Sequence, residues 1–70
     1  MVEVFKTNVQ RRGVANALVA LLHNNFPGSR INFDLEDCDR VLRVEGDNFH
    51  PEKVMMLVNE NGFQCHIMED

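Results

Sequence analysis

The side chains that could do chemistry in this 70-residue chain include two cysteines and three histidines. Cys38 lies in the acidic stretch Glu36-Asp37-Cys38-Asp39, where a thiol and carboxylates together could bind a metal ion. Reactive thiols need positive surroundings that stabilise the thiolate, and these neighbours are negative. A short turn also supplies few converging oxygen atoms. We therefore interpret the stretch as a solvated acidic turn, and we retain Cys38 only as a candidate metal ligand.

Cys65 and His66 are the one adjacent pair of metal-ligand residue types in the sequence. Neighbouring residues of a β-strand point to opposite faces of the sheet, so the two cannot bind one ion from regular strand geometry. We expect Cys65 to be a small core residue, since free cysteine is often buried. His66 is expected on the open sheet face, and both residues remain candidate metal ligands.

No arrangement of residues typical of an enzyme is present. Ser29 is the only serine, so a Ser-His-Asp triad has no support. His23 and His50 have no further ligand at the close spacing of zinc sites. The sequence contains no glycine-rich phosphate loop, and Gly46 to Asn48 is an ordinary connector. We expect a protein that is not an enzyme and that has no cofactor supported by a motif.

Residues 2–7 (VEVFKT) alternate and are predicted to form a strand. A helix is predicted next, capped by Thr7 or Asn8 and continuing to about Asn25. Its apolar stripe consists of Val14, Ala17, Leu18, Leu21 and Leu22. The stretch 30–46 (RINFDLEDCDRVLRVEG) then predicts two strands around an acidic tip. Ile31, Phe33, Leu35, Leu42 and Val44 are expected to face the core.

A second helix is predicted to begin at His50-Pro51, because proline suits the first helical position. It ends before Gly62, and residues 63–68 (FQCHIM) form the last strand, with Phe63, Cys65 and Ile67 inward. The order strand-helix-strand-strand-helix-strand predicts an α+β domain over residues 1–70. Its expected form is ferredoxin-like βαββαβ, a four-stranded antiparallel sheet with both helices on one face. Right-handed crossovers place the first and third strands in the centre.

Three apolar residues are expected on the sheet face that the helices leave open, namely Phe5, Val41 and Met68. Such a cluster, surrounded by charges, is a candidate contact surface. Recognition of RNA on this face would need aromatic platforms within a basic surface. The chain has a net charge of −4, which disfavours nucleic acid. We therefore expect a protein partner or a homodimer.

The remaining composition favours a reduced, cytoplasmic protein. The first residues show no signal peptide. No stretch approaches the ~20 apolar residues that span a bilayer, so no membrane association is expected. Two cysteines so far apart do not indicate a disulfide framework.

The chain resembles the heavy-metal-associated domains of copper chaperones and metal-transporting ATPases. The resemblance covers nearly the whole chain and rests on VEVFKT, ANALVALL, INFDLED, RVLRVEG and NENGFQC in this order. The family binds soft metal ions through a Cys-x-x-Cys loop after the first strand, where this chain has KTNVQRR. Alignment of the apolar helix stripes places Thr7 and Gln10 at the two cysteine positions. A shift of one residue places Asn8 and Arg11 there instead. Neither supplies a thiolate, so the metal site is not carried over.

These observations favour a non-enzymatic binding module that resembles the family and acts through protein contact, including self-association across the open sheet face. The alternative is metal-ion binding or transfer through unconventional ligands drawn from Cys38, Cys65, His66 or the acidic tip.

Overall fold

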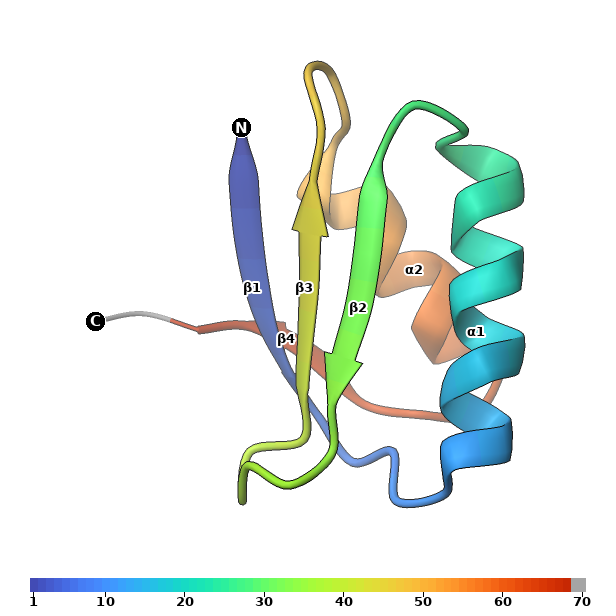
Figure 1. Cartoon of the computed structure of the whole chain (residues 1–70), viewed down its shortest axis with the longest axis vertical. Coiled ribbons are helices and arrows are strands. Elements are labelled where there is room, and N and C mark those ends of the chain that lie inside the picture. The colour runs from blue at the N-terminus through green and yellow to red at the C-terminus, as the bar shows by residue number, and fades with distance from the viewer. Residues whose placement is uncertain (69–70) are drawn as a thin grey trace.

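The computed structural model describes residues 1–68, whose elements follow the order β1-α1-β2-β3-α2-β4 (Figure 1). The four strands form one antiparallel sheet in the order β2-β3-β1-β4, so β1 and β3 are central as predicted. The domain is therefore α+β. The strands are β1 (Val2–Thr7), β2 (Arg30–Asp34), β3 (Val41–Glu45) and β4 (Cys65–Ile67), and the helices are α1 (Arg12–Asn25) and α2 (Pro51–Glu60).

Both helices lie against the same face of the sheet (Figure 1). The core fills the space between the two layers, and its fully buried members include Phe5, Leu42, Val44, Val54 and Val58. The inward positions predicted for β2 and β3 are confirmed, since Ile31 and Phe33 are buried beside Leu42 and Val44. Leu35 lies beyond β2 and is half-buried against the core.

The prediction that Phe5 projects from the open face is wrong. Its side chain is 0% exposed and shares the helix-covered face with its cross-strand partner Leu42. Both faces of β1 carry apolar residues, so alternation alone does not decide which face is inward. The pairing with β3 decides it, because a strand whose register matches Leu42 and Val44 must bury Phe5.

Helix α1 begins at Arg12, three residues later than a cap at Asn8 would place it. Thr7 does not cap the helix, because its hydroxyl donates to the Arg40 carbonyl and accepts the Val9 N–H. The Asn8 side chain is also engaged, as its Oδ1 accepts the N–H of Gln64 at 2.8 Å. The segment between β1 and α1 is therefore an ordered loop with Val9 fully buried.

The limits of α2 are those that the sequence predicts. Pro51 is the first residue, and His50 before it is extended, with φ −99° and ψ 116°. Gly62 follows the helix with φ +92°, a conformation that favours glycine. The N–H groups of Gly62 and Phe63 donate to the carbonyls of Asn59 and Val58, which is the Schellman pattern of a helix end.

Candidate functional site

The face of the sheet that the helices leave open carries two of the three predicted contact residues, Val41 and Met68. The strand registers define its residues, because every second side chain points to it. They are Arg30, Asn32 and Asp34 of β2, Val41, Arg43 and Glu45 of β3, Val2, Val4 and Lys6 of β1, and His66 and Met68 at β4. We call this set the open face.

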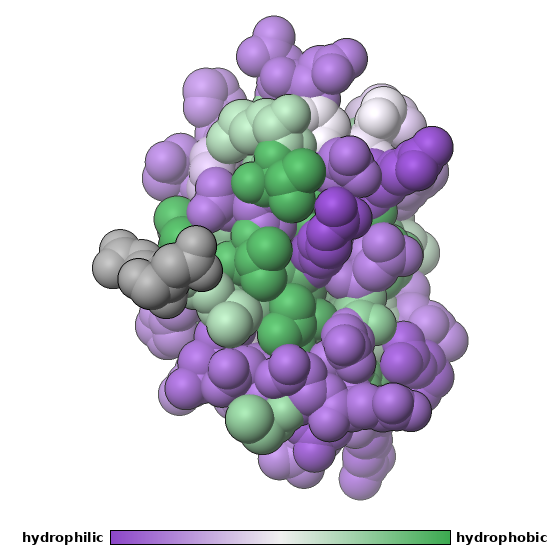
Figure 2. Space-filling model, turned by 60° about the vertical axis from the view of Figure 1, so that its left-hand side comes forward, coloured by the Kyte–Doolittle hydropathy of each residue, from purple (hydrophilic) through white to green (hydrophobic). Residues whose placement is uncertain are grey.

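Apolar residues form a continuous strip across the open face, and we name Val2, Val4, Val41 and Met68 the apolar strip. Val4 lies at its centre: it follows Val2 on the same side of β1, and its carbonyl accepts the Met68 N–H at 2.8 Å. Val41 is its diagonal neighbour on β3, two residues before its direct partner Arg43. Figure 2 shows hydrophobic residues gathered in a band along the molecule with hydrophilic residues on both sides.

The exposure of the strip differs from one residue to the next. Val2 is 45% exposed and Met68 36%, whereas Val4 and Val41 are half-buried between longer polar side chains. Two of the three predicted contact residues, Val41 and Met68, thus lie on the open face, and Phe5 does not. Sequence reasoning missed Val2 and Val4 as members of the strip. Lys6 could have identified them. A lysine is rarely buried, so it indicates the outward side of β1, and by alternation Val2 and Val4 lie on that same side.

The open face is the less acidic part of the molecule. It carries three basic side chains and two acidic ones, a formal charge of +1, whereas the whole chain carries −4. Opposite charges are interleaved, since Arg43 pairs with Glu45 at 3.4 Å and Arg30 lies directly opposite Glu45. Such exposed pairs each stabilise the fold by less than ~1 kcal/mol. They leave a mixed border of both signs around the apolar strip.

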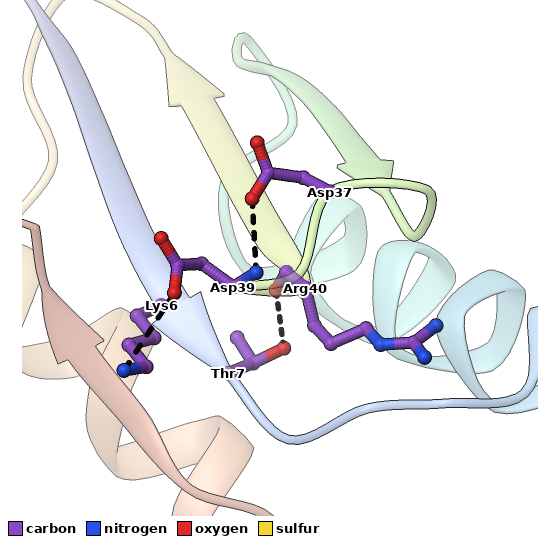
Figure 3. A network of polar contacts seen from close by, with 5 residues as sticks. All are labelled: Lys6, Thr7, Asp37, Asp39 and Arg40. Atoms are coloured by element: carbon purple, nitrogen blue, oxygen red, sulfur yellow. Dashed lines mark hydrogen bonds and ion pairs between the residues drawn. The ribbon is translucent and has the colours of Figure 1, made fainter.

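The acidic turn between β2 and β3 is held by its own polar contacts (Figure 3). The Asp37 carboxylate accepts the N–H of Asp39 at 2.9 Å, and the Asp39 carboxylate lies 3.6 Å from the Lys6 ammonium group. Thr7 joins the turn to β1, because it donates from its side chain to the Arg40 carbonyl and from its backbone to the Asp39 carbonyl. The carboxylates thus have structural roles in the turn.

Cys38 is exposed within this turn, and potential ligand atoms of Asp37, Cys38 and Asp39 lie within 4.8 Å of one another. Within residues 1–68 no other three His, Cys, Asp or Glu side chains converge in this way. The basic residues nearest to the turn engage its oxygens: Lys6 pairs with Asp39, and the Arg40 guanidinium donates to the Leu35 carbonyl at 2.8 Å. The arrangement offers two carboxylates and one thiol on an open surface.

The structure does not bring Cys65 and His66 together with Cys38 in a ligand cluster. Cys65 is 2% exposed, as predicted for a core residue, and burial raises the pKa of its thiol to about 12. His66 is exposed and pairs with Lys6, on the opposite face from Cys65. A neutral buried thiol and an imidazole on the other side of the strand do not form a shared metal site.

The positions aligned with the family's cysteines lie in the loop before α1. Thr7 is buried and Asn8 accepts a backbone N–H, so neither side chain is free to bind an ion. Gln10 and Arg11 border a surface pocket of about 310 Å³ together with Asn8, Val14 and Phe63. The loop presents amide and guanidinium groups, which do not replace thiolates for a soft metal.

No helix within residues 1–68 is long and apolar enough to cross a membrane. Comparison of the chain with protein-family models, with curated proteins and with solved structures finds no match.

Proposed function

We propose that this protein is a non-enzymatic binding module that associates with a second copy of itself across the open face. The observation that carries the proposal is the apolar strip, which crosses the two central strands and is not covered by either helix. Apolar side chains on a surface bordered by charges favour protein contact, because association removes them from water.

We further propose that the module is a ferredoxin-like relative of heavy-metal-associated domains that has lost the thiolate site. The strand order β2-β3-β1-β4 and the placement of both helices on one face support this assignment. The loop before α1 supports the loss, since its side chains are occupied within the fold or lack sulfur. In such a domain the open face offers a surface for recognition that does not need the metal loop.

A second copy is the occupant that the charges favour. Two copies of a chain of net charge −4 repel each other over most of their surfaces. The open face is the exception, because its basic and acidic side chains nearly balance and can pair with those of a facing copy. An isologous contact of this kind requires one self-complementary patch only.

The size of the face predicts a weak dimer. Four strands spaced ~4.8 Å apart and about five residues long present a footprint of roughly 300 Å². A stable interface buries about 800 Å² per partner, which would be about a sixth of the 4624 Å² of this chain. The contact is therefore expected to be reversible and populated at high protein concentration.

Sedimentation velocity over a range of concentrations tests the proposal. The wild-type protein should sediment faster as concentration rises, and Val4→Lys should remain monomeric at every concentration. Ala20→Lys is the matched control, because it adds the same charge on an exposed position of α1. Val2→Lys is a second strip variant at a more exposed residue, where misfolding does not complicate the result. Equal sedimentation of wild type and both strip variants would overturn the proposal.

A second candidate function, metal binding, rests on the convergence of Asp37, Cys38 and Asp39. Titration of Zn(II), Ni(II) and Cu(I) into the reduced protein, followed by NMR, separates it from the first. Stoichiometric shifts centred on the acidic turn, abolished by Cys38→Ser, would favour metal binding. Unchanged spectra favour the binding module.

A further inference from the structure

We infer that the free edge of β4 and the groove beside it bind an extended basic peptide by strand addition. This surface is separate from the apolar strip, and the partner is a different one. The α2–β4 groove is a shallow, open depression of about 580 Å³. Its residues are Glu52, Met55, Met56, Asn59 and Glu60 of α2 and Cys65 and His66 of β4.

The backbone of β4 is arranged for an additional strand. The N–H groups of Gln64 and Met68 are directed toward the β1 side, because they donate to the Asn8 side chain and to the Val4 carbonyl. Hydrogen-bonding direction alternates along an antiparallel strand, so Cys65 and Ile67 direct their N–H and C=O groups to the other side. That side is the end of the sheet, since β4 is the last strand in the order. A chain that approaches there finds donors and acceptors ready to pair.

The groove provides an apolar floor for a side chain of the added strand. Met56 is 46% exposed and Met55 is half-buried, and flexible thioether side chains adapt to different apolar partners. Cys65 also lines the groove, but it is 2% exposed and adds little surface of its own. Ile67 lies on the same side of β4 as Cys65 and is 39% exposed. Its cross-strand partner Phe5 is fully buried, so Ile67 is the apolar residue of this pair that a partner can contact.

The charge of the groove selects the partner. Two carboxylates, Glu52 and Glu60, and one imidazole, His66, line it, and no lysine or arginine does. A second copy of this acidic chain would add negative charge there, whereas a basic segment would be attracted. The two glutamates are eight residues apart on α2, which is about 12 Å along the helix. In an extended strand, residues four positions apart on one face are ~13 Å apart. The spacing fits a Lys-x-apolar-x-Lys segment.

The probe is the peptide acetyl-Thr-Lys-Thr-Leu-Thr-Lys-Thr-amide, titrated to about 1 mM into the ¹⁵N-labelled full chain at low salt. We expect amide shifts at Cys65, Ile67 and Met56, and slower hydrogen exchange at the Cys65 and Ile67 amides. Replacing both lysines of the peptide by glutamate should abolish binding. Replacing the central leucine by proline should do so as well, because proline lacks the N–H that pairs with an edge.

Protein variants locate the site. The double variant E52Q/E60Q should bind about three- to tenfold more weakly, as expected for two exposed ion pairs. E36Q/D47N removes two charges from exposed loop residues outside the groove, so it is the matched control and should bind as the wild type does. Val4→Lys should also bind the peptide, so failure of self-association and failure of this proposal are distinguishable.

Three results would overturn the inference. One is the absence of any shift at 1 mM peptide, and another is equal binding by E52Q/E60Q and wild type. The third is a set of shifts at Cys65 and Ile67 that depends on protein concentration without peptide, which would identify the occupant as a second copy.

Discussion

The hydroxyl of Thr7 donates a 2.6 Å hydrogen bond to the backbone carbonyl of Arg40, which lies 33 residues later in the chain. The bond joins the end of β1 to the acidic turn, and the Thr7 N–H adds a second bond to Asp39 at 3.1 Å. Thr7 is 6% exposed, so water does not replace these contacts. Two features that look unrelated in the sequence, the loop between β1 and α1 and the acidic turn, are thus one structural unit.

Thr7→Val removes this bond at nearly constant volume. We expect a loss of roughly 1–3 kcal/mol of unfolding free energy, because the Arg40 carbonyl and the Val9 N–H lose a buried partner. Urea denaturation measures the loss. Thr7→Ser keeps the hydroxyl and should be the more stable of the two variants; equal stabilities would show that the hydrogen bond does not matter.

Gly46→Ala is expected to destabilise the protein. A Cβ at this position would collide with the side chain of Ser29, which is itself buried. Overpacking of this kind destabilises by about 1–3 kcal/mol, which thermal unfolding detects as a lower Tm. Adding Ser29→Ala should restore part of the loss, because it removes the colliding oxygen.

Gly13→Ala is the control for Gly46→Ala, because its added Cβ meets open space. It should stabilise the protein. No atom lies within 4 Å of the added Cβ, and Gly13 is the second residue of α1. Alanine is the better helix former by up to ~1 kcal/mol, so the Tm should rise. A lower Tm for Gly13→Ala would mean that the loop before α1 depends on this glycine.

The two thiols should differ sharply in reactivity. Cys38 is exposed, whereas Cys65 is buried with its pKa raised to about 12. At neutral pH an alkylating reagent should modify Cys38 much faster than Cys65, which reacts only as fast as the protein opens. Mass spectrometry over time measures both rates, with Cys38→Ser as the control that isolates Cys65.

The same raised pKa predicts how stability depends on pH. The unfolded thiol ionises near its ordinary value of 9.0, while the folded thiol stays neutral until about pH 12. The contribution of Cys65 is therefore complete below pH 9 and is lost as pH rises toward 12, by at most about 1.4 kcal/mol per pH unit. Cys65→Ala should show a weaker decline of unfolding free energy over this range. An identical decline in both proteins would assign it to other groups.

The sequence predicts much of the fold because its signals are local. Pro51 and Gly62 mark the ends of α2 through backbone geometry, and the inward residues of β2 and β3 follow from strict alternation. The start of α1 does not depend on local signals alone. Thr7 and Asn8 form hydrogen bonds with Arg40 and Gln64, which belong to distant segments, and so they do not cap the helix. Polar side chains with two possible partners therefore mislead a capping argument.

The candidate site was only partly predictable for the same reason. Val41 and Met68 follow from the alternation of their own strands, but the same argument predicts the wrong face of β1 for Phe5. Only the pairing of Phe5 with Leu42 shows that Val2 and Val4 complete the strip. The α2–β4 groove left no signal, because it combines two segments whose packing the sequence does not state.

The most direct test of self-association across the open face is a dilution series recorded by NMR on the ¹⁵N-labelled wild-type protein. We predict that the amides of Val2, Val4, Val41 and Met68 shift together as the concentration falls, while exposed α1 residues such as Ala20 stay constant. Concentration-independent shifts at all four strip residues, in a protein that also sediments as a monomer, would contradict the account.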